Sequence, residues 1–350
     1  MKEKVLFWIG EQKSPVKVDR SEDYVMDSII HYYQDINPIL KYSTKRLFLD
    51  NGAYTARMKG IELVRERVID IQEKLKPELT IPLDFPFTPG DSINRMKELW
   101  KKTSDNIIFW QNSSSLKEKL VPTLHSWSAS SLQNNLKWLV KNANSDMISV
   151  GSLVDYSFSE FNGFFGDRQP RIELIELLAR SVSIMQKNSD FNIHLLGMGS
   201  SPLTLNLVYY LGFRSTDSAG TRRKAAHGKV IFPGMGELYC GYGTASFGRS
   251  ISDTIKIIKE KQKECECPIC RTDPTKIVSN DPNKCPDWKD LAIHNEYVMK
   301  KERETAEKLL SMGIEYYEKY LDGIFERSSL RYLWEHAKLC KKMYKISDVI

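Results

Sequence analysis

Short apolar runs rich in β-forming residues alternate with helix-period segments along the first 220 residues of this chain. Amphipathic stretches such as Ile61–Leu75 and Ile172–Met185 lie between these runs. Strands that alternate with helices of this length form parallel sheets, because each helix returns the chain to the same edge. The sequence therefore predicts an α/β protein. Seven strand-like runs are present, at residues 5–10, 46–54, 78–86, 120–127, 147–153, 191–199 and 212–220.

This alternation of strands and helices is typical of a TIM-like (β/α)8 barrel, which needs eight strands. Residues 91–112 do not supply the missing strand, because Met96, Trp100 and Trp110 recur at helical spacing. We place the eighth strand near Pro15–Val18. Residues 1–250 are then expected to form the barrel and to carry its active site.

The pattern changes after about residue 245. Ile251–Gln262 has the spacing of a charged helix, whereas Pro268–Pro286 contains four prolines and no periodicity. Two further helical runs follow, at Asp290–Tyr320 and Ser328–Lys345. We expect an inserted subdomain at 251–300 and C-terminal helices at 301–350 that pack on the barrel.

Three cysteines lie within six residues, at Cys265, Cys267 and Cys270, and His294 follows 24 residues later. Three thiolates and one imidazole form a closed tetrahedral set, which is typical of structural zinc. Free thiols at this density are the less favoured alternative. Cys285 competes with His294 as the fourth ligand, and we prefer His294 because a helix can hold an imidazole rigidly. The segment 251–300 is therefore predicted to be a zinc-binding subdomain.

Three aspartates stand at the carboxyl ends of separate predicted strands: Asp50, Asp84 and Asp217. In a β/α barrel these ends converge on one pocket, so the three carboxylates are expected to meet there. Each alone is also a plausible turn or helix-capping residue. Paired carboxylates suit displacement at an anomeric carbon, where one attacks and a second transfers protons.

Other residues at the strand ends suit a flat ligand. Glycines let a planar ring approach the backbone, although glycines are ordinary in such loops. Tyr54 can stack on a ring. His125 and His194 also lie in strand runs, where a structural core histidine is the alternative. The glycines are Gly52, Gly151, Gly197 and Gly199.

These motifs together resemble the tRNA-guanine transglycosylase superfamily, over nearly all of the chain from about Leu47 to Tyr320. The segment HLLGMGSSPLTLNLVYYLGFRSTDSAG is similar to the run that leads to the family's nucleophile. CECPIC with LAIHNEYVM resembles its zinc signature, and LDFPFTP with the Asp-Ser-Ala beginning at Asp217 resembles its archaeosine-forming branch.

The resemblance implies exchange of a guanine in a polynucleotide for a 7-deazaguanine such as preQ0. By position, Asp217 would be the nucleophile that attacks C1′, and Asp50 the general acid/base. Asp84 would read the guanine edge. The base must be flipped out of its stack to reach such a pocket. The basic residues Arg222, Arg223 and Lys224 would contact phosphates. The alternative for these three residues is a solvated basic turn. The implied base-binding set is Asp84, Tyr54, His125, Gly151, Ser152, His194 and Gly197.

Several positions depart from the family pattern. Asp50-Asn51-Gly52-Ala53-Tyr54 stands where the family usually has Asp-Ser-Gly-Gly-Phe, and His125 stands in place of a glutamine. The resemblance does not include the extra RNA-binding domains of the archaeosine branch. On these grounds DNA is slightly favoured as the polymer, with tRNA as the alternative. A noncatalytic nucleic-acid-binding subunit is a further alternative.

Composition sets broad limits. The net charge of +6 permits a polyanionic partner without requiring one. No apolar run approaches the length of a membrane span, and the N-terminal apolar stretch is too short for a signal peptide. We expect a cytoplasmic protein without a membrane partner, and both a homodimer and a partner subunit stay open.

Overall fold

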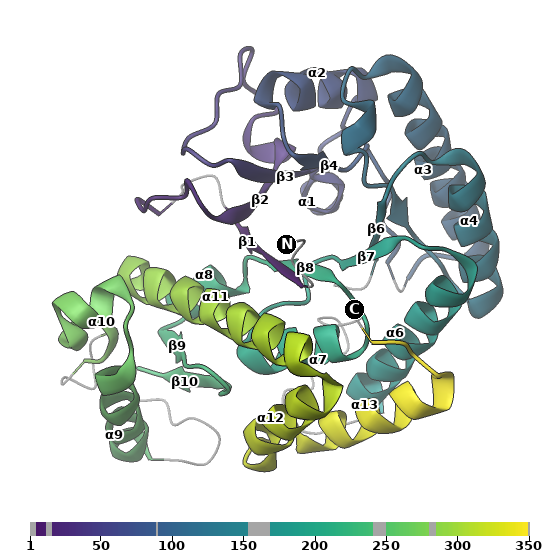
Figure 1. The fold of residues 1–350 in the computed structure, drawn as a ribbon. Coiled ribbons are helices and arrows are strands. Elements are labelled where there is room, and N and C mark those ends of the chain that lie inside the picture. Colours follow the sequence, from purple (N-terminus) through teal and green to yellow (C-terminus); the bar gives the residue numbers. More distant parts are fainter. Residues whose placement is uncertain are drawn as a thin grey trace.

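Eight parallel strands form the centre of the molecule (Figure 1). The computed structural model describes residues 5–11, 16–88, 90–152, 169–240, 250–279 and 285–348. The strands are short, and most of their residues are buried. They are β1 (Leu6–Gly10), β2 (Tyr24–Ser28), β3 (Arg46–Asp50), β4 (Leu79–Thr80), β5 (Thr123–Leu124), β6 (Met147–Val150), β7 (Asn192–Leu195) and β8 (Ser215–Ser218).

The strand order closes the sheet into a barrel. The hydrogen-bonded order is β4-β3-β2-β1-β8-β7-β6-β5. A parallel bridge between Thr80 and Leu120 joins the two outer strands, and the Val121 N–H donates to the Thr80 carbonyl at 2.9 Å. The predicted TIM-like barrel is therefore confirmed.

The eighth strand was predicted in the wrong place. It is β2, which pairs with β1 at Ile9–Val25 and with β3 along its whole length. Val16–Val18 form no strand, and Pro15 lies outside the described residues. The β2 run YVMDS is brief and ends in polar residues, so its strand character depends on two neighbouring strands rather than on its own pattern.

Helices follow most strands and cover the barrel. The helix predicted within residues 91–112 is present as Ile93–Ser113, and it buries Met96, Ile107 and Trp110. The Ser92 side chain caps it by accepting from the Arg95 N–H. The barrel helices are α1 (Ala53–Met58), α2 (Arg65–Leu75), α3 (Ile93–Ser113), α4 (Ala129–Asn142), α6 (Gln169–Asn188), α7 (Pro202–Tyr210) and α8 (Gly220–Ala226). Short 3-10 helices are η1 (Ile29–His31) and η2 (Lys117–Lys119), with η3 (Gln262–Glu264) and η4 (Pro274–Ile277) later in the chain.

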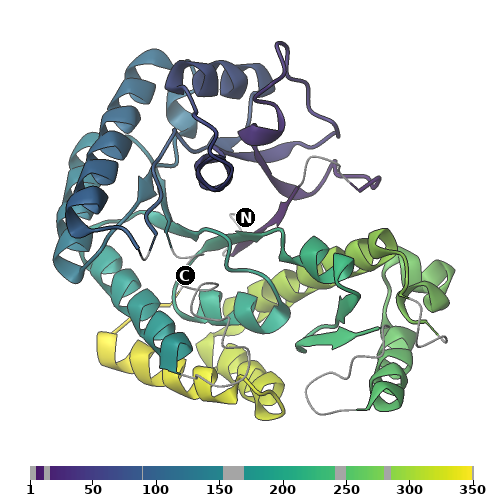
Figure 2. The same cartoon turned by 180° about the vertical axis from the view of Figure 1, so that it is seen from behind.

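The chain after β8 builds a lateral region and then returns to the barrel (Figures 1 and 2). One long helix, α11, crosses residue 300 without interruption and packs against α8. The last helix, α13, lies beside α6 in both views. The elements are β9 (Lys229–Ile231), β10 (Glu237–Tyr239), α9 (Ile251–Lys261), α10 (Pro268–Thr272), α11 (Trp288–Met312), α12 (Ile314–Glu326) and α13 (Arg331–Tyr344).

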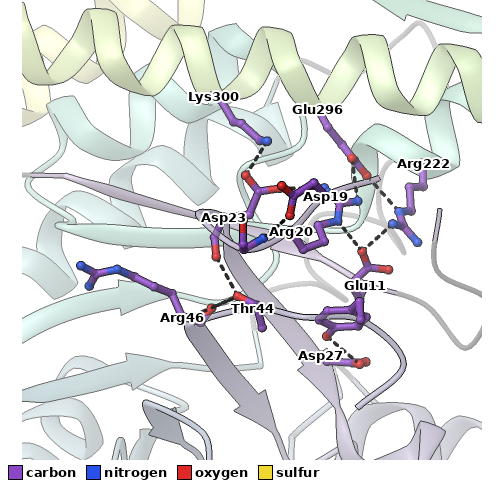
Figure 3. Close-up of polar contacts among 12 residues, drawn as sticks. Glu11, Asp19, Arg20, Asp23, Asp27, Thr44, Arg46, Arg222, Glu296 and Lys300 are labelled. Carbon is purple, nitrogen blue, oxygen red and sulfur yellow. Dashed lines mark hydrogen bonds and ion pairs between the residues drawn. The ribbon is translucent and has the colours of Figure 1, made fainter. Parts of the chain in front are cut away.

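A buried ion network joins α11 to the barrel (Figure 3). Glu11 follows β1, Arg20 precedes β2, Arg222 lies on α8 and Glu296 on α11. Both arginines contact both glutamates, at 2.7 to 3.0 Å, and all four side chains are almost fully buried. Asp23 and Lys300 extend the network with one negative and one positive charge. Each buried charge therefore has an opposite partner.

The described part of the chain contains no helix with the length and apolar character needed to span a bilayer.

Substitution of Arg222 tests this network. Arg222→Ala removes one cation and leaves Glu11 and Glu296 underpaired, so the free energy of unfolding should fall by about 3–5 kcal/mol. Denaturant unfolding of purified protein measures the loss. The matched control is Arg223→Ala, on the same helix but exposed, where the change should stay below about 1 kcal/mol. Equal effects at both positions would contradict the role of the network.

Candidate active site

The three predicted aspartates lie around one cavity at the carboxyl ends of the strands. Asp50 is the last residue of β3, Asp84 follows β4, and Asp217 lies in β8. All three line a cavity of about 1530 Å³. Residues 34 and 133 positions apart in the sequence are thus brought together by the barrel, as strand-end residues should be.

Two backbone N–H groups and one imidazole side chain contact Asp217. Its Oδ1 accepts a hydrogen bond from the Gly197 N–H at 2.7 Å, and its carbonyl accepts from the Gly199 N–H at 3.1 Å. Gly197 has φ of 76°, which a residue with a side chain rarely adopts. His194 Nε2 lies 3.3 Å from Asp217 Oδ1. The loop after β7 therefore orients the carboxylate.

Asp50 has a different environment. Its Oδ2 accepts from Ser28 Oγ at 3.1 Å and from the Gly52 N–H at 2.9 Å. Desolvation, then the nearby Asp84 charge and more weakly that of Asp217, raise the pKa of Asp50 to about 7 against these two hydrogen bonds. A carboxyl group with a pKa near neutrality can both donate and accept a proton, as a general acid/base must.

Asp84 has a partner on each oxygen. Asn51 Nδ2 donates to Oδ1 at 3.1 Å, and His125 Nε2 lies 3.0 Å from Oδ2. Asn51 also donates to the Pro82 carbonyl at 2.7 Å, so its amide is fixed by two acceptors. Each carboxylate oxygen has two acceptor positions, so one on each oxygen remains for a ligand.

The tautomer of His125 follows from its two contacts. The Phe87 N–H donates to Ser152 Oγ at 2.7 Å, and Ser152 Oγ lies 2.8 Å from His125 Nδ1. A carboxylate oxygen only accepts, so the imidazole proton is on Nε2, facing Asp84, and Nδ1 accepts the serine hydrogen. Ser152 has φ of 65°, and a Cβ on Gly151 would lie 2.6 Å from the His125 ring. This tight fit makes His125 a rigid support for Asp84.

His125 and His194 are predicted from the sequence to contact the base. The structure shows both rings buried beside carboxylates, His125 at Asp84 and His194 at Asp217. Ser28 and Asn51 were missed. Asn51 could have been noticed because it adjoins Asp50, but Ser28 lies in the strand that the sequence did not reveal.

The basic run on α8 divides into three different environments. Arg222 was expected to contact phosphates, and this is wrong, because its side chain is 1% exposed and paired with Glu11 and Glu296. Lys224 forms an ion pair with Glu237. Arg223 is exposed and lines the cavity, as does Tyr54, which is 38% exposed on α1. Lys224 lines the same cavity, so Tyr54, Arg223 and Lys224 stay predicted contact residues.

Cys265, Cys267, Cys270 and His294 form one cluster, with all ligand atoms within 4.8 Å of one another. His294 Nδ1 lies 3.6, 3.3 and 3.6 Å from the three sulfurs. A zinc tetrahedron with ordinary Zn–S and Zn–N bonds has S–N edges of about 3.6 Å.

The surroundings of the cluster also fit a metal. His294 Nε2 lies 2.9 Å from the Ile231 carbonyl, so it carries the proton and leaves the Nδ1 lone pair facing the sulfurs. Cys285, the competing ligand, contacts Cys240 instead. The donor set therefore fits a closed zinc site that joins α10 to α11, remote from the carboxylates.

The fold and site define a class: a β/α barrel with three carboxylates at its mouth and a Cys₃His cluster in a lateral region. Residues 39–313 match the family model described as queuine tRNA-ribosyltransferase. The chain belongs to this family.

The chain is similar to curated archaeal proteins. A tRNA-guanine(15) transglycosylase of Methanosarcina mazei is 22% identical over 225 residues, which is 64% of this chain and 40% of the relative. The Sulfolobus acidocaldarius tRNA-guanine(15) transglycosylase is 23% identical over 304 residues, 83% of this chain and 53% of the relative. The chain spans about half the length of the curated relatives it matches. The resemblance to the archaeosine branch is confirmed by these names.

The pKa of Asp50 predicts a pH-dependent stability. The pKa of Asp50 is raised from 3.8 to about 7 in the folded state. Between about pH 4 and pH 7 the unfolded chain has therefore lost the Asp50 proton while the folded protein keeps it, so the free energy of unfolding falls progressively over this range. Asp50→Asn removes that penalty. The Tm of this variant minus that of the native protein should therefore increase from pH 5 to pH 8 in thermal melts.

The matched control is Asp91→Asn. Asp91 pairs with Arg57 at 3.0 Å and has a lowered pKa, so it is ionised throughout this pH range. Its Tm difference should be negative and nearly constant. A constant difference for Asp50→Asn would show that Asp50 does not titrate near neutrality.

Metal analysis tests the cluster. We expect about one zinc per chain by elemental analysis, and loss of the metal with a lower Tm in His294→Ala and Cys267→Ala. Cys285→Ala should keep its zinc, since Cys285 lies outside the cluster. Retention of zinc in His294→Ala together with its loss in Cys285→Ala would reverse the assignment of the fourth ligand.

Proposed function

We propose that this protein exchanges a guanine base in tRNA for a 7-deazaguanine such as preQ0, through a covalent bond between Asp217 and C1′ of the nucleotide. The observation that carries the proposal is the placement of Asp217, Asp50 and Asp84 around one cavity, each in a different electrostatic environment. Family membership and the names of the relatives support it.

Two displacements would complete the exchange. In the first, an electron pair of Asp217 forms the bond to C1′ while the bond from C1′ to guanine N9 breaks, and Asp50 protonates the departing base. In the second, Asp50 takes the proton from the incoming base, whose nitrogen attacks C1′ and releases the Asp217 carboxylate. The pKa of Asp50 near 7 supports both proton transfers at neutral pH.

Asp84 is suited to recognise the guanine edge. Guanine presents two adjacent donors, the ring N–H and the 2-amino group, and Asp84 keeps one acceptor position on each oxygen. Asn51 and His125 hold the carboxylate from the other side. A base without the 2-amino group would leave one buried acceptor unpaired, which disfavours its binding. We assign backbone contacts with the base to Gly151, Ser152 and Gly197.

A polynucleotide must deliver the base to this cavity in a flipped-out form. Tyr54 at the mouth offers a ring for stacking, and the exposed Arg223 offers a cation for a phosphate. The names of the relatives describe action on tRNA. We therefore place tRNA ahead of DNA, although the sequence alone slightly favoured DNA. A homodimer or a partner subunit, and a cytoplasmic location, stay expectations.

Incubation with labelled guanine and either bulk tRNA or DNA tests the proposal. Label should enter tRNA, and denaturing gels should show a covalent protein–RNA adduct. Asp217→Ala should lose the adduct and reduce exchange at least about 10³-fold, whereas Asp50→Asn should slow exchange and still allow the adduct.

Other outcomes have definite meanings. Label in DNA alone would establish the DNA-modifying alternative. Label in neither polymer, with an intact and zinc-loaded protein, would overturn the proposal in favour of a noncatalytic subunit. Exchange by Asp217→Ala at the native rate would show that another group is the nucleophile.

A further inference from the structure

A histidine and a serine lie behind Asp217, deeper in the barrel. His194 is on β7 and Ser215 is on the adjacent strand β8, and both are fully buried. His194 Nδ1 lies 2.9 Å from Ser215 Oγ, and His194 Nε2 lies 3.3 Å from Asp217 Oδ1. The imidazole therefore stands between a hydroxyl group and the candidate nucleophile.

The protonation of His194 follows from a third residue, Trp8 of β1. Trp8 Nε1 donates to Ser215 Oγ at 2.9 Å. An indole N–H is only a donor, so Ser215 accepts there, and among the described residues His194 Nδ1 is the acceptor that contacts the Ser215 hydroxyl. The imidazole proton is then on Nε2, directed at Asp217. A neutral ring with this tautomer gives Trp8 and Ser215 a hydrogen-bond partner each, without an additional charge in the core.

The Nε2–H group of His194 has no hydrogen-bond partner among the described residues, although Asp217 Oδ1 is within ion-pair distance. A buried donor in this state is unfavourable unless another state of the site supplies its acceptor. Catalytic hydrogen bonds are often long in the free protein and shorten in complexes with ligand. The Asp217 carboxylate lies 3.3 Å from this donor and is the acceptor that such a state would supply.

We infer that His194 is a positioning residue for Asp217, with its tautomer set by Ser215. This inference rests on the proposed glycosyl transfer. The N–H groups of Gly197 and His194 both face Oδ1, which leaves Oδ2 as the oxygen that bonds to C1′. When that bond breaks in the second displacement, its electron pair returns to Asp217, and the two donors at Oδ1 stabilise the carboxylate as it forms.

Four variants test this role in the guanine exchange assay, with kcat, KM, adduct level and Tm measured for each. His194→Phe keeps the ring shape and removes the donor, so kcat should fall about 10²-fold with KM within about twofold. His194→Gln places an amide N–H near the Nε2 position and should recover at least about tenfold of that loss. Ser215→Ala should lower kcat about tenfold, because either imidazole tautomer then becomes available.

Ser149→Ala is the matched control. Ser149 is a fully buried serine on β6, paired in register with His194, and its hydroxyl donates to Thr123 Oγ1 at 3.0 Å, away from the carboxylates. It should change Tm as a lost buried hydroxyl does and leave kcat within about twofold.

A larger share of trapped adduct in His194→Phe would support the role, since the second displacement needs the donors most. Native kcat in both His194→Phe and Ser215→Ala, with the native protein active, would overturn the inference while leaving the proposed function intact. Equal losses in His194→Phe and His194→Gln would also overturn it, because packing rather than the N–H group would then matter. Inactivity of the native protein on both polymers would instead reject the proposed function.

Discussion

The burial of Glu296 on α11 is the constraint on which the arrangement of the molecule depends. A carboxylate removed from water must be paired, and here Arg20 and Arg222 provide the charges, with Glu11 completing the network. These four residues come from the segment after β1, the loop before β2, α8 and α11. Their pairing therefore joins these elements in the observed arrangement. Because α8 directly follows the strand that carries Asp217, the network also fixes one side of the active site.

Helix α11 combines this network with two other buried polar contacts. Two residues before Glu296, His294 joins the cysteine cluster, and further along Glu302 accepts from Asn206, Tyr320 and the Gly234 N–H. One continuous helix thus connects the metal cluster, the barrel and the C-terminal helices. A structural role for the metal is consistent with this arrangement, since the cluster holds one end of the helix that carries Glu296.

The three carboxylates of the candidate active site differ in environment. Desolvation and the charge of Asp84 bring the pKa of Asp50 close to neutrality, whereas Asp84 and Asp217 each receive directed N–H groups. Two imidazoles have similar surroundings: His125 lies beside Asp84 with Ser152 at its other nitrogen, and His194 lies beside Asp217 with Ser215 at its other nitrogen. Different environments allow chemically identical side chains to have different roles.

The sequence by itself determined the features that depend on the local pattern of residues. Alternating strand and helix periods indicated the barrel, the position of each aspartate after an apolar run indicated the shared cavity, and Cys265, Cys267 and Cys270 indicated the metal cluster through their spacing. These signals are short in range, so no knowledge of long-range contacts was needed to read them.

Only the tertiary structure decided the rest. Strand β2 is stabilised by its two neighbours and lacks a clear pattern of its own. Arg222 lies in a run of charges that resembles an exposed turn, yet a glutamate 74 residues away makes its burial favourable. The partners of His125 and His194 come from other strands, and their tautomers depend on hydroxyl groups of Ser152 and Ser215. Hydrogen-bond direction and charge pairing are properties of distance and orientation, which the order of residues along a chain does not contain.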